Sequence, residues 1–327
     1  MIRKKTAYMV LLFLFMLVLA ACGRTTTESA NGTSVKQNTA VEEKEVQTVK
    51  HLKGTAVLPQ KIERMVVLSA AYIDHMLTIG EKPAGVNVEV RYGGDYLPYL
   101  ADQLQGVPTV GSADSPNLEA IVQIDPDVIV IESRTAENSY DQLEKIAPTI
   151  VLGTDWMEYE DGTTYWTRDL LTIAGMYNKV ELAKEKIAEV EKQADQLKAK
   201  MEQLNQKKLA YLRVREKNLQ IYAEKGHPTN TLLYHDLGFV PAAVTPAEQR
   251  EDLSMEKISD IDADFIVLEV DPNAQDYLSK MHDSSLWKNV PAVRTNQVYQ
   301  TDSFWLFKGW GAIGRTEIIR EIKGMIQ

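Results

Sequence analysis

Cysteine is nearly absent from this 327-residue chain, which contains only Cys22. One thiol cannot form an internal disulfide, so Cys22 must serve some other purpose. Histidine is scarce too, and the five histidines are scattered without the short ligand spacing of a zinc or manganese site. This scarcity argues against a protein that binds a metal ion directly through its own side chains.

Catalytic motifs are missing as well. There is no Gly-x-Ser-x-Gly motif, no glycine-rich loop of the kind that binds phosphate, and no second cysteine that could act as a nucleophile. We therefore do not expect an enzyme. The formal net charge is −10, and it becomes −13 if Arg3, Lys4 and Lys5 are removed with an N-terminal signal, so a nucleic-acid partner is not expected.

The N-terminus resembles the export signal of a bacterial lipoprotein. Three basic residues precede an apolar segment, residues 7–20, that is too short for an ordinary membrane-spanning helix, and LAACG surrounds Cys22. In the bacterial lipobox that LAACG resembles, the cysteine is lipidated and becomes the first residue of the mature protein. We predict a signal peptide over residues 1–22 and a lipid anchor on Cys22 at the outer face of the cell membrane. An uncleaved anchor with an incidental cysteine is the alternative.

The segment after the signal has the composition of a linker. Residues 23–55 are rich in threonine, serine, asparagine, glutamine and glutamate and contain few large apolar residues. We predict a flexible tether here, which would let a folded body move above the membrane.

The most informative pattern in the rest of the chain is an internal repeat. LEAIVQIDPDVIVIE, residues 118–132, and MEKISDIDADFIVLE, residues 255–269, share eight identical positions at a constant offset of 137 residues. IGEKPAGV, residues 79–86, and LGFVPAAV, residues 237–244, resemble each other and occur in the same order. A repeated α/β unit predicts two lobes of similar design with a cleft between them.

The spacing of apolar residues extends this prediction to the whole body. Continuous apolar runs alternate with helical segments, which is typical of parallel sheets covered on both faces. Residues 165–207 contain no proline, and an apolar stripe from Leu182 to Leu204 predicts a long helix, with a coiled-coil partner helix as the alternative. We predict an α/β fold of two sandwich lobes with mainly parallel sheets, over residues 56–164 and 208–327, joined by one long rigid helix.

Taken in order, these segments resemble one known family. The lipobox, RMVVLS at residues 64–69, KIAPTIVL at residues 145–152, the repeat, the linking helix and SSLWKNVPAVRTNQVY at residues 284–299 are similar to the lipoprotein-anchored solute-binding proteins of bacterial ABC importers for ferric siderophores. The resemblance covers nearly all of the mature chain. It implies a ferric siderophore as transported ligand, no covalent cofactor, and a permease dimer with its ATPase subunits as partner. We expect the binding protein itself to be a monomer.

The resemblance leaves the type of siderophore open. ESRTAENSYDQLEKIAPTIVL is similar to the subset that binds ferric citrate or related carboxylate and hydroxamate siderophores, which we favour. LAYLRVREKNLQIY is similar to the matching strand of catecholate siderophore binders.

The resemblance also assigns a role to two glutamates. In the family, one glutamate from each lobe docks against arginines on the two permease subunits, and Glu119 and Glu256 match those positions. A glutamate in the first turn of a helix also complements the helix dipole, which is the alternative role. Their equivalent places in the repeat favour docking, because a two-fold partner surface needs two matching anions.

Five arginines follow predicted strands or lie in loops, where ligands of α/β proteins usually bind. Arg134 comes directly after the duplicated strand, which places it at the mouth of the N-terminal lobe. Arg213 and Arg215 are two positions apart on a predicted strand, so both face the same side of it. Two cations on one face need an anion or a carboxylate to compensate them. Arg91 and Arg250 lie in loops. We predict that these arginines bind an anionic chelate that already surrounds its iron with oxygen ligands.

Each arginine also has a less specific interpretation. Arg134 could instead form an ion pair with Glu132 or Glu137, and the loop arginines could simply be solvated.

Aromatic side chains are predicted to complete the pocket. Tyr222 and Trp305 lie in segments that resemble cleft-lining loops, and Trp156, Trp310 and His227 lie near such segments. Core packing is the alternative for each tryptophan, and an ordinary surface loop is the alternative for His227.

Other classes of protein remain as alternatives. Haem or cobalamin uptake uses the same scaffold, since one tyrosine or histidine could supply an axial ligand, although several arginines fit the less anionic cobalamin poorly. A direct metal-ion binder and a surface adhesin are less favoured. An adhesin would not explain arginines at the mouths of two lobes.

Overall fold

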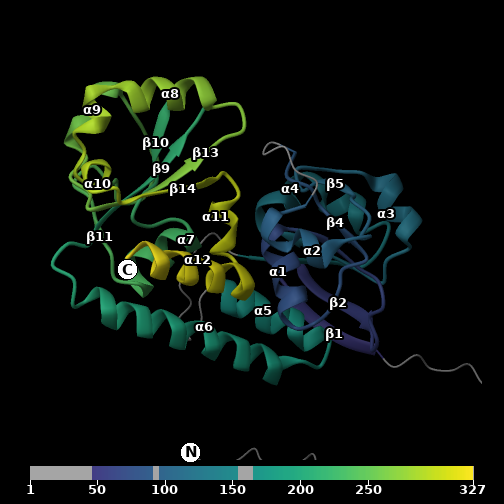
Figure 1. The fold of residues 1–327 in the computed structure, drawn as a ribbon. Helices are drawn as coiled ribbons and strands as arrows, with labels where there is room; N and C mark the ends of the chain where they lie inside the picture. Colours follow the sequence, from purple (N-terminus) through teal and green to yellow (C-terminus); the bar gives the residue numbers. More distant parts are fainter. Residues whose placement is uncertain (1–45, 91–95, 154–164, 327) are drawn as a thin grey trace, which may run out of the picture. The chain divides into compact units, whose positions relative to one another are not determined.

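The structure is a computed structural model that describes residues 46–90, 96–153 and 165–326. All of these residues belong to one unit, residues 44–327. Within it, two α/β lobes lie on either side of a group of helices, with the long helix α6 (Val180–Met201) running beneath them in the view of Figure 1. The predicted signal peptide, Cys22, Arg91 and Trp156 lie outside the described residues.

The N-terminal lobe is built on a four-stranded parallel sheet. In sheet order its strands are β4 (Gly85–Val86), β3 (Met65–Leu68), β7 (Val128–Glu132) and β8 (Thr149–Leu152). The helices that connect these strands include α1 (Ala70–Thr78), α2 (Ala101–Leu104), α3 (Leu118–Ile124) and α4 (Ser133–Leu143). Helix α1 ends just before Gly80, whose φ of +73° is a left-handed conformation that ends a helix.

The C-terminal lobe has a mixed sheet. In sheet order its main strands are β12 (Glu251–Leu253), β10 (Leu219–Ile221), β9 (Lys208–Val214), β13 (Phe265–Val270) and β14 (Val298–Asp302). Strands β9, β13 and β14 are parallel, whereas β10 runs antiparallel to both of its neighbours. The short β11 (Val240–Pro241) pairs with β9. The main helices on this sheet are α8 (Gln275–Asp283), α9 (Ser285–Lys288) and α10 (Pro291–Arg294).

Both faces of each sheet are buried, as continuous apolar strands require. Along β3, Met65 and Val67 face one core, and Val66 and Leu68 face another. The first of these cores continues through α1, α5 (Tyr165–Met176), α6 and α12 (Ala312–Met325) to β9 and β13. The helices between the lobes therefore belong to a core that both sheets share.

The internal repeat is confirmed by matching contacts in the two lobes. Asp127 accepts hydrogen bonds from the backbone N–H groups of Glu63 and Arg64, both at 2.8 Å, just before β3. At the equivalent place, Asp264 accepts a hydrogen bond from the N–H of Lys208 at 2.9 Å, at the start of β9. The same aspartate therefore fixes the beginning of a neighbouring strand in each lobe.

The two copies differ in the short helix before the duplicated strand. In the first copy, the Asn117 side chain caps the helix by accepting a hydrogen bond from Ala120 N. The second copy forms the 3₁₀ helix η4 (Met255–Asp260), and its N-cap Ser254 makes no such bond.

The predicted long linking helix is present as α6, but its predicted bounds, residues 165–207, are too wide. The segment forms two helices, because Asn178 takes a left-handed conformation with a φ of 56° between the end of α5 and the start of α6. Asparagine tolerates this conformation better than most residues, so it can end a helix where no glycine or proline is present.

The predicted tether also extends too far. A β-hairpin of β1 (Val46–His51) and β2 (Gly54–Pro59) occupies its last part, and Leu52 N donates a hydrogen bond to Val151 O of β8 at 3.0 Å. Alternate residues of β2, Ala56 and Leu58, are buried against the lobe, which explains why this polar segment is folded.

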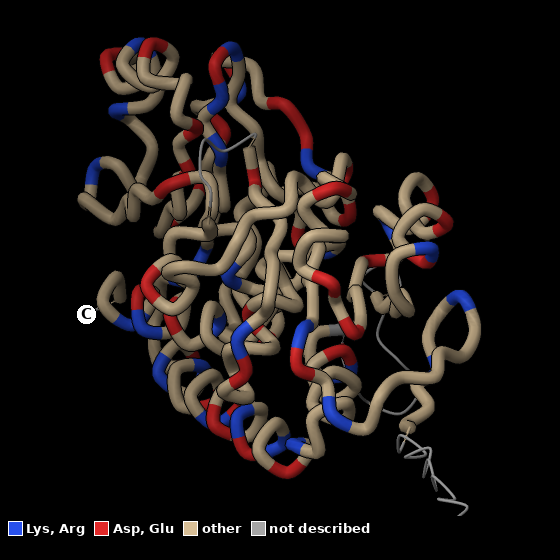
Figure 2. The backbone as a smooth tube through the Cα atoms, turned by 90° about the vertical axis from the view of Figure 1, so that its right-hand side faces the viewer, with Lys and Arg blue, Asp and Glu red and all other residues tan. Residues whose placement is uncertain are grey.

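Charged residues are mixed over the surface of the described chain. In Figure 2, basic and acidic positions alternate along the backbone, most densely on α6. Within residues 46–90, 96–153 and 165–326, no helix is both long and apolar enough to cross a bilayer.

Candidate ligand-binding site

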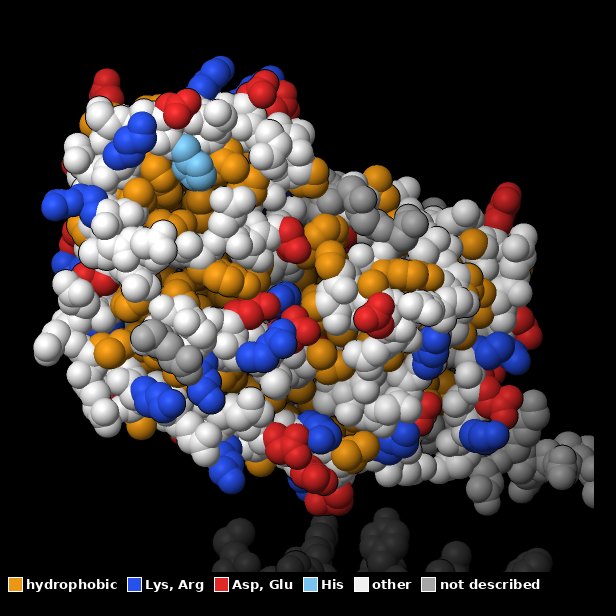
Figure 3. Space-filling view, in the orientation of Figure 1, with side chains coloured by type: hydrophobic (Ala, Val, Ile, Leu, Met, Phe, Trp, Pro, Cys, Tyr) orange, Lys and Arg blue, Asp and Glu red, His pale blue; other side chains and the backbone are white. Residues whose placement is uncertain are grey.

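A cavity of about 610 Å³ is lined by residues of both lobes. On the face shown in Figure 3, apolar side chains are visible between the lobes, with basic and acidic side chains next to one another among them. A cavity of this size is typical of sites for small organic ligands. The charged residues that line it are Arg134, Lys225, Arg250, Glu89, Asp114 and Glu248.

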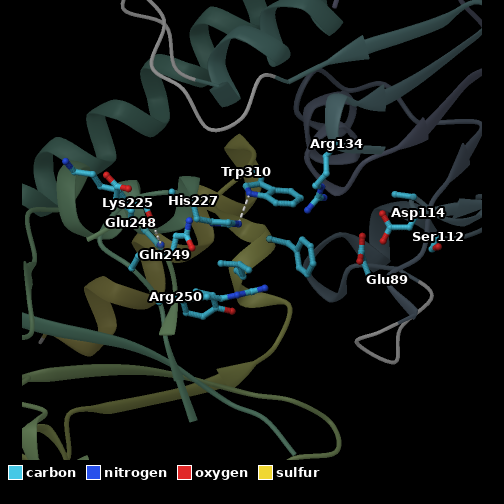
Figure 4. Close-up of a pocket in the computed structure, with 17 residues that line it drawn as sticks. Glu89, Ser112, Asp114, Arg134, Lys225, His227, Glu248, Gln249, Arg250 and Trp310 are labelled. Carbon is cyan, nitrogen blue, oxygen red and sulfur yellow. Dashed lines mark hydrogen bonds between the residues drawn. The ribbon is translucent and has the colours of Figure 1, made fainter. Parts of the chain in front are cut away.

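These charges lie on facing walls. Glu89, Asp114 and Arg134 come from the N-terminal lobe, and Figure 4 shows them across the cavity from Lys225, Glu248 and Arg250 of the C-terminal lobe. The described lining therefore carries three positive and three negative side chains, and it is not the cationic rim that the arginine pattern predicted.

Aromatic rings form the middle of the site. The Trp310 ring is stacked against His227 at a centroid distance of 5.4 Å, and the Arg134 guanidinium lies 5.9 Å from the centroid of the Trp310 ring. Phe307 meets Trp310 edge to face at 5.3 Å. Figure 4 shows Arg134, Trp310 and His227 in sequence across the pocket. This row offers flat apolar surface beside a cation, which suits a ligand with conjugated or chelate-ring faces.

His227 is held as a neutral ring. Its Nε2 lies 3.0 Å from the Nε1–H donor of Trp310, and its Nδ1 lies 3.2 Å from the backbone N–H of Thr229. A neutral imidazole accepts at one nitrogen only, so each tautomer makes one of these two hydrogen bonds. Burial, assisted by the positive charges of Arg134 and Arg250, lowers the pKa of His227 to about 3. His227 therefore contributes shape and hydrogen bonding to the site and no positive charge at physiological pH.

Tyr222 lines the pocket in front of a buried carboxylate. Its hydroxyl donates to Glu269 Oε2 at 2.8 Å, and its ring packs at a tilt against the Tyr211 ring, with the centroids 4.2 Å apart. The Tyr211 hydroxyl donates to the other oxygen of Glu269. Burial raises the pKa of Glu269 to about 8. The hydrogen bonds from the two tyrosine hydroxyls and the positive charge of Arg213 act in the opposite direction and lower this pKa.

Stability is therefore expected to depend on the ionisation of Glu269. Because the folded-state pKa lies above the ordinary value of 4.5, the protonated carboxyl favours folding, and this contribution is lost as the pH rises towards 8. Glu269→Gln stays neutral, so its unfolding free energy should rise relative to that of the wild type by on the order of 1 kcal/mol per pH unit between about pH 5 and 8. Urea unfolding of both proteins at several pH values measures this difference. A difference that does not change with pH would contradict the assignment.

Of the four predicted arginines that the structure describes, Arg134 and Arg250 reach the pocket. The alternative interpretation of Arg134 is true as well, since its Nη2 pairs with Glu132 Oε2 at 3.0 Å while the side chain lines the cavity.

Arg213 is buried, and Asp271 binds it through Nε at 2.7 Å and Nη2 at 3.1 Å. The carboxylate that an inward-facing arginine requires is thus supplied by the neighbouring strand. Arg215 borders a separate hollow at the end of β9 with Asp271 and Asn273.

Of the predicted aromatic residues, Tyr222 lines the pocket and Trp305 does not. Trp305 is fully buried, and its Nε1 donates to Glu321 Oε2 at 2.6 Å. It meets Tyr211 edge to face at 5.3 Å, one layer behind the pocket, so core packing is its role. The polar lining residues Glu89, Asp114, Lys225 and Glu248 were not predicted, because loop residues give no periodic signal that shows which way they face.

The two predicted docking glutamates lie away from the pocket. Glu119 is exposed in the first turn of α3, and Glu256 is exposed in the first turn of η4, so the repeat places one on the surface of each lobe.

The fold and the site together define a class of protein: a two-lobed binding protein that holds a small ligand between α/β lobes. Residues 65–304 match the family model for periplasmic binding proteins, and the chain belongs to this family. It is therefore a substrate-binding protein and not an enzyme. The predicted family and the α/β fold class are confirmed.

The relatives of the chain include two Bacillus subtilis (strain 168) proteins. The probable siderophore-binding lipoprotein YfiY is 31% identical over 315 residues, which is 91% of each chain. The Fe(3+)-citrate-binding protein YfmC is 27% identical over 300 residues, covering 92% of this chain and 90% of that protein.

Solved structures show the same fold. Staphylococcus aureus SirA complexed with staphyloferrin B has a TM-score of 0.68 at 25% identity, over 86% of this chain and 98% of that one. The petrobactin-binding protein YclQ from Bacillus subtilis has a TM-score of 0.72 at 24% identity, over 87% of this chain and 99% of that one.

Proposed function

We propose that this chain is the lipid-anchored binding protein of an ABC importer and that it captures a ferric siderophore in the pocket between its lobes. The observation that carries the proposal is a cavity of about 610 Å³ with an arginine on each wall and Trp310 between them. Relatives named for siderophore and ferric citrate binding support it. Cys22 would anchor the protein at the outer face of the membrane, as the name of the lipoprotein relative supports.

The chemistry of the pocket suits a cargo whose iron is already coordinated. Among the described residues, no cluster of three or more histidine, cysteine, aspartate or glutamate side chains is arranged to hold a metal ion. A siderophore supplies the oxygen ligands itself and needs only cationic hydrogen-bond donors and flat apolar surface from the protein. Arg134, Arg250 and Trp310 provide these groups.

The names of the relatives bear on the type of siderophore. We infer that the cargo is a ferric citrate or a related carboxylate or hydroxamate chelate, which a relative named for Fe(3+)-citrate binding supports. A haem ligand is less favoured, because the tyrosine and the histidine of the described lining are already engaged: Tyr222 with Glu269 and His227 with Trp310.

A titration of the purified protein tests the proposal. Ferric citrate, a ferric trihydroxamate, a ferric triscatecholate and haem are each added while tryptophan fluorescence is followed, since Trp310 lies in the pocket. We expect saturable quenching by the carboxylate or hydroxamate chelates. Quenching by haem alone would replace the proposal with haem uptake.

Truncation of Arg134 is expected to weaken binding of the quenching chelate by about 10- to 100-fold, or about 1.5 to 3 kcal/mol, because one charge-assisted bond is lost. The same titration on Arg134→Ala measures the effect. Arg215→Ala is the matched control, since that arginine borders a different hollow and should leave affinity unchanged. Wild-type affinity in Arg134→Ala would remove this residue from the site.

A further inference from the structure

The repeat contains another pair of equivalent glutamates, Glu132 and Glu269, at the ends of β7 and β13. Their exposed fractions are 4% and 0%, and neither belongs to the described lining of the pocket. A buried carboxylate is costly unless hydrogen bonds and charges compensate it. Two such residues at one position of a repeat therefore call for a physical explanation.

Glu132 connects the core of the N-terminal lobe with the pocket. Ser69 Oγ donates to Glu132 Oε1 at 2.5 Å from the core side, and Arg134 Nη2 donates to Oε2 at 3.0 Å from the pocket side. The Arg134 side chain is 58% exposed, whereas that of Glu132 is 6% exposed. A rigid buried anion thus holds one edge of a largely solvated arginine.

Glu269 has the same arrangement in the C-terminal lobe. Tyr211 of β9 donates to it from the core side, and Tyr222 donates to it from the pocket wall. Two other groups face Glu269: the Arg213 cation on β9 and the backbone N–H of Leu306 on α11 (Trp305–Lys308). Its neighbour on the adjacent strand β14 is Thr301, which is uncharged. Glu269 on β13 therefore joins the pocket-lining Tyr222 to β9 and α11.

We propose that Glu132 and Glu269 are positioning residues, one in each lobe, which fix Arg134 and Tyr222 in the pocket wall before the cargo binds. The inference rests on the proposed function for the identity of the cargo, but the contacts themselves do not depend on it. Arginine has many rotamers, and holding it in place beforehand lowers the entropic cost of binding. The repeat explains why both lobes use the same position. In each lobe, the carboxyl-terminal end of the duplicated strand lies directly behind the pocket.

A double-mutant cycle separates positioning from a general effect of charge. Glu132→Gln should weaken binding of the tightest ferric chelate of the panel about 3- to 10-fold in the wild type and have no effect in the Arg134→Ala background. Glu269→Gln should behave in the same way relative to Tyr222→Phe. Equal effects in both backgrounds, or tighter binding by the single Gln variants, would overturn the proposal.

Asp271→Asn is the matched control. Asp271 is a nearly buried carboxylate just after β13 that binds Arg213 and not a pocket residue, so its replacement should leave affinity unchanged in every background. Loss of affinity in this variant equal to that in Glu269→Gln would mean that any buried acid near this strand end affects binding, which would also overturn the proposal.

A measurement without cargo distinguishes failure of this inference from failure of the proposed function. NMR relaxation of the Arg134 Nε–H group and the flip rate of the Tyr222 ring are measured in the full protein. We expect an ordered guanidinium and slow ring flips in the wild type, greater mobility of Arg134 in Glu132→Gln, and faster flips in Glu269→Gln. Unchanged mobility in both variants would overturn the inference even if a ferric chelate binds, and increased mobility would support it even if no chelate does.

Discussion

Lysine in place of Glu119 or Glu256 is expected to abolish uptake of the ferric siderophore by cells while the purified protein keeps its affinity. Both glutamates are exposed in the first turn of a short helix, and they occupy equivalent positions in the two lobes. The family resemblance implies that each meets arginines on one subunit of the permease. A lysine would place like charges against each other, which costs several kcal/mol at an interface.

Uptake of a siderophore loaded with iron-55 is measured in cells that carry each variant. The affinity of each purified variant is measured by fluorescence titration. Glu185→Lys is the control, because Glu185 is an exposed glutamate on α6 and its reversal changes the net charge by the same amount. Normal transport by either docking variant would count against the docking role. Loss of transport in the control would show that net charge alone is responsible.

The second large effect is expected from Asp74→Ala, which should lower the free energy of unfolding by about 3 kcal/mol or more. Asp74 of α1 is fully buried, and its two oxygens accept hydrogen bonds from the N–H groups of Ile313 at 3.1 Å and Gly314 at 2.9 Å. These groups belong to the first turn of α12, whose N-cap, Gly311, has no side chain to bind them. Alanine would leave both donors without this acceptor, one of them buried and the other partly buried.

Two further variants make this prediction specific. Asp74→Asn keeps one acceptor oxygen and should lose less stability than alanine. Gly311→Ala should also be destabilising, because a Cβ there would lie 2.1 Å from Asp74 Cγ. Denaturant unfolding of the three proteins measures the order of effects. An alanine variant as stable as the wild type would show that α12 does not depend on this cap.

The parts of the fold that could be predicted from the sequence are those with a periodic or repeated signal. The repeat predicted equivalent strands and turns, and the matching bonds of Asp127 and Asp264 confirm it. The break between α5 and α6 was missed because it depends on the backbone conformation of one residue, Asn178. Propensity along a helix cannot show where a single asparagine turns left-handed.

The site was less predictable, because its composition depends on contacts between residues far apart in the chain. The alternation along β9 predicted that Arg213 needs an anion or a carboxylate, but only the pairing of β9 with β13 brings Asp271 within 2.7 Å of it. Trp305 and Trp310 are only five positions apart, and the short helix α11 turns the first into the core while the second lines the pocket. Arg134 was predictable, because the repeat itself fixed its place.

The most direct test of the proposed function is to locate the iron. Crystals of the protein grown with the ferric chelate that binds most tightly should show one anomalous iron peak in the cavity between Arg134, Trp310 and Arg250, with all six coordinating atoms supplied by the chelate. An iron peak outside this cavity, or one coordinated by side chains of the protein, would contradict the account.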